Sequence, residues 1–160
     1  MVTGLMLFWF LGFSARAQKV ESKAFQLMLN ELLSDTIPVV AVAELAEMKS
    51  PLSLDARSRE EYAVSHLKNA LWVGHEDFSL ERVPKNLMGQ TVVVYCSIGL
   101  RSEEVAGRLI KAGYTQVYNL YGGIFEWLNQ EQEIYNDAGP TDNIHPYNFA
   151  WGLWLREGKK

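Results

Sequence analysis

The segment Thr91–Tyr95 (TVVVY) constrains the fold of this chain more than any other. Four β-branched residues and a tyrosine stand in a row, without the apolar–polar alternation of a half-exposed strand. Such a run predicts a strand covered on both faces, as in a parallel sheet with a helix layer on each side. A short turn and then a predicted helix over Ser102–Ala112 follow this strand directly. This order of strand, turn and helix is typical of an α/β fold.

The same alternation extends along the chain. We predict further strands at Ile37–Val42, Leu52–Asp55, Ala70–Val73 and Val117–Leu120. We predict further helices over Glu21–Leu33, near Glu44–Met48, from Ser58 to about Val64, and over Gly123–Asn129, the third opening with a capping box. On the exposed side of the helix after the central strand, Glu104 and Arg108 have the spacing of an ion pair. The pattern predicts one α/β domain, a central parallel sheet with helices on both faces.

The length of 160 residues suits a single domain, with different segments at its two ends. We predict a signal peptide over 1–17, an amphipathic helix within 18–36, the α/β domain over 37–134, and a tail over 135–160. The tail is expected to carry a short docked helix around Trp151 and Trp154.

The first residues have the pattern of an export signal. Leu5–Phe13 is apolar but too short to span a bilayer, and Ala15 and Ala17 fit a signal-peptidase site. Cleavage after Ala17 predicts an exported, periplasmic protein without a stable membrane span. The alternative is that the N-terminal segment stays uncleaved and anchors the protein.

Charge and composition exclude two kinds of ligand. The net charge is −4, and no basic cluster is longer than Lys159–Lys160, which argues against a nucleic-acid partner. The three histidines are scattered and the chain has one cysteine, so no zinc-site spacing occurs and no metal is expected.

The cysteine, Cys96, stands where chemistry is expected. It follows the central strand, at the carboxyl edge where parallel α/β sheets bind ligands. Backbone N–H groups of a turn that leads into a helix stabilise a thiolate and lower its pKa. Gly99 allows the turn, and Arg101 adds a positive charge suited to an anionic substrate. We therefore predict that Cys96 is a nucleophile.

Several motifs resemble those of rhodanese sulfurtransferases, in the same order and over about Ala41–Gln130. The active loop of that family is similar to Cys96-x-x-Gly99-x-Arg101-Ser102. The other matching elements are Leu54-Asp55-Ala56-Arg57, Glu61-Tyr62, His66, Ala70, Val117-Tyr118-Asn119-Leu120-Tyr121-Gly122-Gly123 and Trp127. Ser65 and Asn69 depart from the pattern, since the family usually has glycines there.

The resemblance implies a rhodanese-like domain over 37–134 and sulfur transfer. The Cys96 thiolate would take the outer sulfur of a small anionic donor such as thiosulfate, and pass it from a persulfide to an unidentified thiol or protein acceptor. The resemblance implies no cofactor, because the covalent persulfide carries the sulfur. The implied substrate-binding residues are Ser97, Ile98, Gly99, Leu100 and Arg101, with Asp55, Arg57 and Ser102 as supporting residues.

The sequence leaves two alternatives open. A non-catalytic rhodanese module would bind a partner protein, although such modules commonly lose the cysteine that this chain keeps. A related cysteine phosphatase would need five residues between cysteine and arginine, whereas four separate Cys96 from Arg101. Asp55 and Arg57 have two interpretations as well: they orient the active loop, or they form a strand-end ion pair.

Overall fold

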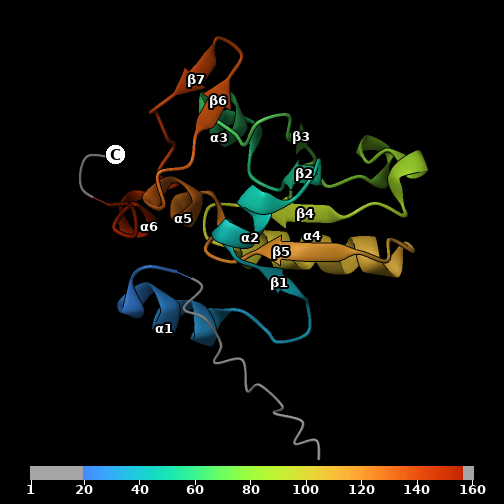
Figure 1. Cartoon of the computed structure of the whole chain (residues 1–160), viewed down its shortest axis with the longest axis horizontal. Helices are drawn as coiled ribbons and strands as arrows, with labels where there is room; N and C mark the ends of the chain where they lie inside the picture. The colour runs from blue at the N-terminus through green and yellow to red at the C-terminus, as the bar shows by residue number, and fades with distance from the viewer. Residues whose placement is uncertain (1–19, 157–160) are drawn as a thin grey trace, which may run out of the picture.

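A five-stranded parallel sheet forms the centre of the computed structural model, which describes residues 20–156 (Figure 1). The strand order is β1-β5-β4-β2-β3, and every neighbouring pair is parallel. The strands are β1 (Val39–Val40), β2 (Leu52–Asp55), β3 (Leu71–Trp72), β4 (Val92–Tyr95) and β5 (Val117–Leu120). The β-branched run therefore forms the central strand, as predicted. The predicted signal peptide, residues 1–17, lies outside the described residues.

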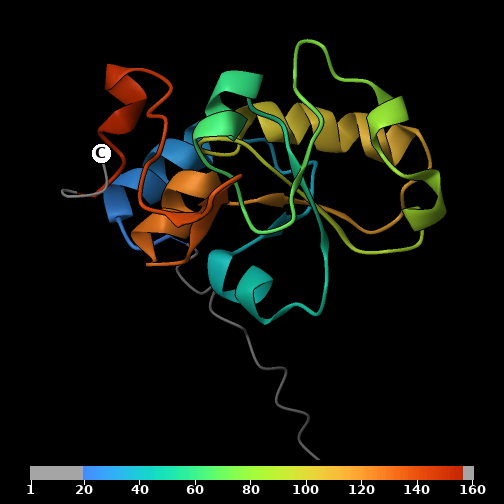
Figure 2. The same cartoon turned by 90° about the horizontal axis from the view of Figure 1, so that it is seen from above.

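Helices cover both faces of the sheet, which confirms the predicted α/β class. They are α1 (Lys23–Leu32), α2 (Val42–Glu47), α3 (Arg59–Val64), α4 (Leu100–Lys111), α5 (Gly123–Asn129) and α6 (Phe149–Gly152), with 3-10 turns at Leu80–Arg82 and Lys85–Leu87. Figure 2 shows α2 and α4 on opposite sides of the sheet. Alternate residues of β4 explain this: Val93 and Tyr95 pack in the cluster with α2 and α5, Val92 and Val94 in the one with α4.

Local sequence accounts for the helix starts. Ser58 Oγ accepts a hydrogen bond from the Glu61 N–H (3.3 Å), and the Glu61 carboxylate accepts one from the Ser58 N–H (3.0 Å), which is the predicted capping box. Helix α4 begins two residues earlier than predicted, because Gly99 turns the chain directly into it. The predicted pairing of Glu104 with Arg108 is wrong. Glu104 instead lies 2.9 Å from the ring Nε2 of His75.

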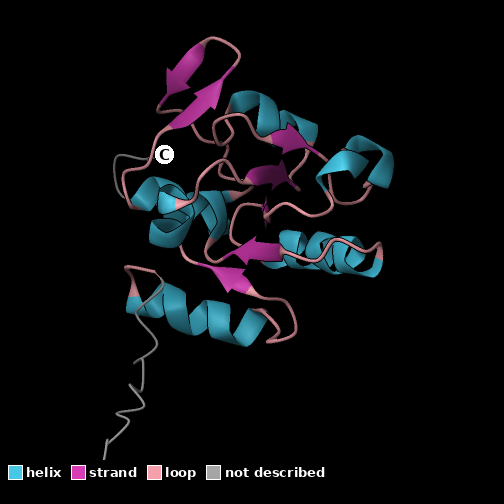
Figure 3. Cartoon of the chain, turned by 45° about the vertical axis from the view of Figure 1, so that its right-hand side comes forward, coloured by secondary structure: helices cyan, strands magenta, loops and turns pink. Residues whose placement is uncertain are grey.

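The C-terminal segment was predicted as an irregular tail with a helical turn, but it also contains a hairpin. Strands β6 (Ile134–Asn136) and β7 (Gly139–Thr141) pair antiparallel beside α3 (Figure 3). Beyond them, Ile144 and Leu155 are buried in the same core as α1 and α5, and Trp154 stacks on Phe25 at 5.1 Å between ring centroids. The two ends of the described chain thus pack against the domain. Within residues 20–156, no helix is both long and apolar enough to cross a membrane.

Candidate active site

Cys96 directly follows β4, and only 1% of it is exposed. The backbone turns at Gly99, whose φ of +115° is a conformation that residues with a side chain rarely adopt. The turn points the Gly99 N–H back at Cys96, with 3.1 Å between the amide nitrogen and Sγ. Gly99 is also the N-cap of the twelve-residue helix α4. A negative charge on the sulfur is therefore stabilised by a backbone dipole at the positive end of a helix.

The first turn of α5 supports the loop from behind. The Ile124 N–H donates to the Cys96 carbonyl oxygen (2.9 Å), and the Phe125 N–H donates to that of Ser97 (3.1 Å). Gly123 lies so close to the loop that a Cβ atom there would approach the Ser97 carbonyl carbon to 2.6 Å. Its φ of +59° adds a second reason for glycine. The absence of a side chain thus allows α5 to hold the loop through backbone hydrogen bonds.

Asn119 in β5 holds the other side of the turn. Its buried amide Nδ2 donates to the Gly99 carbonyl oxygen (2.9 Å), and its Oδ1 accepts from the Ser102 hydroxyl (2.7 Å). Ser102 thereby fixes the start of α4 relative to the sheet. These contacts preorganise the Gly99 amide, because they leave the turn little freedom to move.

Arg101, in the first turn of α4, is paired with a buried carboxylate. Its Nη1 and Nη2 lie 2.7 and 2.8 Å from the two oxygens of Glu61. The Ser97 hydroxyl donates to Glu61 (2.9 Å) and accepts from Arg101 Nη2 (2.9 Å), which closes a three-residue network. The Glu61 side chain is 2% exposed and that of Arg101 20%. The predicted donor-binding arginine thus has its charge balanced by a neighbouring carboxylate.

The electrostatics of this pair follow from burial and contact. Burial by itself would raise the pKa of Glu61, but hydrogen bonds and charge from Arg101, with the Ser58 amide and the Arg57 charge, lower it to about 2. Burial lowers the pKa of Arg101, whereas Glu61 and the nearby Cys96 raise it, and the net shift is upward. Both partners are therefore charged at neutral pH.

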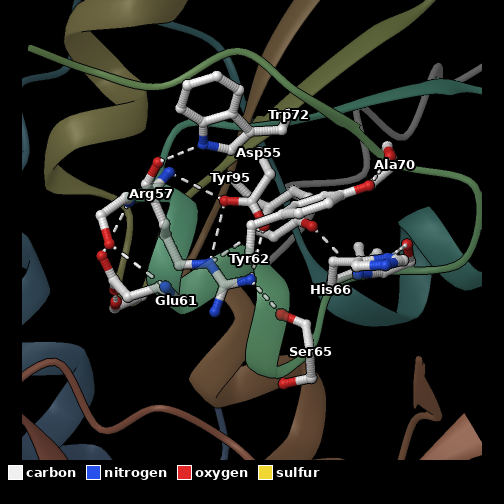
Figure 4. Close-up of polar contacts among 12 residues, drawn as sticks. Asp55, Arg57, Glu61, Tyr62, Ser65, His66, Ala70, Trp72 and Tyr95 are labelled. Carbon is white, nitrogen blue, oxygen red and sulfur yellow. Dashed lines mark hydrogen bonds and ion pairs between the residues drawn. The ribbon is translucent and has the colours of Figure 1, made fainter. Parts of the chain in front are cut away.

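Asp55 and Arg57 form a buried ion pair at the carboxyl end of β2 (Figure 4). Arg57 Nη2 lies 2.6 Å from Asp55 Oδ2 and donates to the Ser65 carbonyl oxygen at 2.5 Å. Burial lowers the pKa of Arg57, but Asp55 raises it well above its ordinary value. The guanidinium carbon also lies 5.7 Å from the ring centre of Tyr95, the residue before the cysteine. The geometry fits the strand-end interpretation, since the pair braces β2 and β4 behind the loop.

The remaining predicted residues lie around the loop. Ile98 is buried in the cluster that contains Val93, while Leu100, the first residue of α4, is about one-third exposed. His66 stacks on Tyr62 with 4.2 Å between ring centroids, and its backbone pairs with Tyr135, so it packs the turn after α3. Residues 20–156 contain no group of three or more His, Cys, Asp or Glu placed to hold a metal ion.

Glu61 is the main site residue that sequence reasoning missed. Its position, three residues after Ser58, indicates a capping box, and the carboxylate does serve as one. The same carboxylate also holds Arg101, which is far away in the sequence. The resemblance to the family did indicate that Glu61 matters, because Glu61 and Tyr62 match one of the family's sequence elements. Asn119 likewise belongs to a matching motif, but the sequence assigned no role to this residue.

Comparisons with known proteins agree with the observed fold. A family model described as "Rhodanese-like domain" matches residues 40–130. The chain is 30% identical over 95 residues to a tRNA uridine(34) hydroxylase of Pectobacterium atrosepticum. The matched region covers 56% of this chain and 26% of that protein, so the chain spans about a quarter of the length of that relative.

Two solved structures share the fold. A rhodanese-related protein from Thermoplasma volcanium has a TM-score of 0.53 and 23% identity, covering 61% of this chain and 96% of that one. A thiosulfate sulfurtransferase from Pseudomonas aeruginosa has a TM-score of 0.56 and 22% identity, covering 71% of this chain and 22% of that one. Because the family model matches more than half of the sequence, this chain belongs to the rhodanese-like domain family.

Proposed function

We propose that the protein is a sulfurtransferase that moves a sulfane sulfur from a donor such as thiosulfate to a thiophilic acceptor, through a persulfide on Cys96. The observation that carries this proposal is the Gly99 N–H, 3.1 Å from the Cys96 Sγ at the start of α4. A backbone donor aimed at the sulfur stabilises a thiolate before the reaction and a persulfide after it.

The reaction has two balanced steps. The Cys96 thiolate attacks the outer sulfur of thiosulfate, the S–S bond of the donor breaks, and sulfite leaves with the electron pair. The persulfide, Cys96–S–S⁻, then gives its terminal sulfur to an acceptor thiolate, and Cys96 returns as a thiolate. No general base is required, because the thiolate is already the nucleophile. The cycle needs no metal and no cofactor besides the persulfide.

The alternatives fit the site less well. A binding module without catalysis needs neither a cysteine nor an amide directed at its sulfur. A phosphatase needs its loop to surround a phosphate and its loop arginine to bind it. Here Arg101 is paired with Glu61, and the loop is one residue shorter than that class of enzyme requires. The tRNA uridine(34) hydroxylases that this chain resembles match it over only 25–39% of their own length. A net charge of −4 does not favour a tRNA partner.

We infer from the first 17 residues that the protein acts outside the cytoplasm after cleavage of a signal peptide. The anchored form is the alternative. In either case the acceptor is a thiol of a small molecule or of a protein.

The half-reaction tests this proposal. Thiosulfate is mixed with the protein in the absence of an acceptor, and released sulfite is measured. We expect about one sulfite per chain in a burst from the wild type, and none from Cys96→Ser, which keeps the shape of the side chain. A burst of equal size from the serine variant would contradict the proposal.

A further inference from the structure

Tyr147 lies at the candidate active site, although it comes from the segment between β7 and α6. Its ring centre is 4.7 Å from the guanidinium carbon of Arg101. Burial lowers the pKa of Arg101, whereas Glu61 and the negative charges of ionised Cys96 and Tyr147 raise it. Arg101 stands at the start of α4, five residues after Cys96, so a ring from the C-terminal segment lies against the active loop.

The chain holds Tyr147 in this place from both sides. Before it, Ile144 is buried in the main core. After it, Asn148 caps α6 by accepting a hydrogen bond from the Trp151 N–H (3.0 Å). The Tyr147 N–H donates to His145 Nδ1 (3.0 Å). The backbone at Tyr147 is thus anchored by the fold on both sides.

Stability alone does not explain a tyrosine at this position. The residue is 47% exposed, and its hydroxyl has no hydrogen-bond partner among residues 20–156. Its φ of +64° lies in the left-handed region, which is unfavourable for a bulky side chain. The free-energy cost of such a backbone conformation is equal to or larger than the stabilisation from an exposed cation–π contact. Strained residues of this kind concentrate at functional sites.

We propose that Tyr147 is a specificity-determining residue that contacts the organic group of a sulfane-sulfur donor at the entrance to Cys96. This inference rests on the proposed function. Two observations support it: Glu61 balances the charge of Arg101, so charge alone does not determine which anionic donor binds best, and the half-exposed ring offers an apolar surface beside that pair. The preferred donors are therefore those that carry the sulfane sulfur on an organic group.

The transfer step is the same for such a donor. With an organic thiosulfonate, R–SO₂–S⁻, the Cys96 thiolate attacks the terminal sulfur. The S–S bond of the donor breaks, the sulfinate R–SO₂⁻ leaves with the electron pair, and Cys96–S–S⁻ forms. Charge and atoms balance without an oxidant or a reductant. The organic group R takes no part in the chemistry, so its contact with Tyr147 affects selectivity only.

The test compares two monoanionic donors, methanethiosulfonate and benzenethiosulfonate, by their kcat/KM values with a common thiol acceptor. We expect the wild type to prefer the aryl donor. We expect Tyr147→Ala to lower the aryl-to-methyl ratio by about 2- to 13-fold, the range of one aromatic pair. Tyr147→Phe keeps the ring and should keep the ratio. Phe149→Ala is the matched control, because Phe149 is 86% exposed two residues away.

A ratio taken within one variant does not depend on how much of that variant is folded. An unchanged ratio in Tyr147→Ala, or an equal fall in Phe149→Ala, would overturn the inference and leave the proposed function standing. A wild type that prefers the methyl donor would overturn it as well. Failure of the wild type to form a persulfide with thiosulfate or with either probe would overturn the proposed function itself.

Discussion

Glutamine in place of Glu61 removes one negative charge from the site and leaves the shape of the side chain nearly unchanged. The Glu61 side chain is 2% exposed and that of Arg101 20%, so the variant leaves a largely buried cation without its counter-ion. Removing one partner of a buried pair is strongly destabilising for this reason. We therefore expect Glu61→Gln to lower the free energy of unfolding.

The magnitude follows from the pKa of the carboxyl group, which falls from an ordinary value of 4.5 to about 2 in the folded chain. At 1.36 kcal/mol per pKa unit, the difference corresponds to about 3 kcal/mol. A lowered carboxyl pKa stabilises the fold above the unfolded pKa, and this contribution is lost as the pH falls from about 5 toward 2. At neutral pH the expected loss of 3 kcal/mol corresponds to a fall in Tm of roughly 6–12 °C.

Urea unfolding at pH 7 and pH 3 measures the effect in the wild type, Glu61→Gln, Arg101→Met and the double variant. The gap between wild type and Glu61→Gln should shrink to less than half at pH 3, because the Glu61 carboxyl of the unfolded wild type is then almost fully protonated. The double variant should be less destabilised than the sum of the single variants, since it leaves no unpaired charge. A gap below about 0.5 kcal/mol at pH 7, or additive single effects, would refute the reasoning.

Three further predictions concern the loop and the N-terminus. Arg101→Ala is expected to lower kcat/KM for thiosulfate by about 5- to 150-fold, with the persulfide still formed at saturating donor; no persulfide at saturation would contradict this. Gly123→Ala should slow sulfite release because its Cβ would meet the loop backbone, whereas Gly139→Ala, also at positive φ but in open space, should not. Equal rates in the two alanine variants would argue against the support from α5. Terminal sequencing of the protein from its native host should find Gln18 first, and an uncleaved N-terminus in the membrane fraction would favour an anchor.

Much of the fold was predictable because local patterns are strong in this chain. The bounds of β2, β5 and α5 match the predicted Leu52–Asp55, Val117–Leu120 and Gly123–Asn129. In each case the apolar pattern is bounded by a turn or a bend. The central strand has no competing interpretation, because a β-branched run this apolar is stable only when both faces are covered.

The parts that were missed depend on contacts between distant segments. The hairpin β6–β7 consists largely of polar residues, glycine and proline, and one of its strands is tied to the loop after α3 by the backbone of His66. The carboxylate of Glu61 satisfies a local capping pattern, so nothing in its neighbourhood indicates the pairing with Arg101. Tyr147 stands in a polar segment with no periodicity. Its role emerges only when the fold brings it to the active loop.

The mass of the intact protein after treatment with thiosulfate tests the central claim most directly. The chain has one cysteine, so an added sulfur needs no assignment among several thiols. We predict a gain of one sulfur atom in the wild type, loss of that sulfur on addition of a thiol acceptor, and no gain in Cys96→Ser. A wild type that turns over sulfur without ever carrying the added mass, or a serine variant that gains it, would contradict sulfur transfer through Cys96.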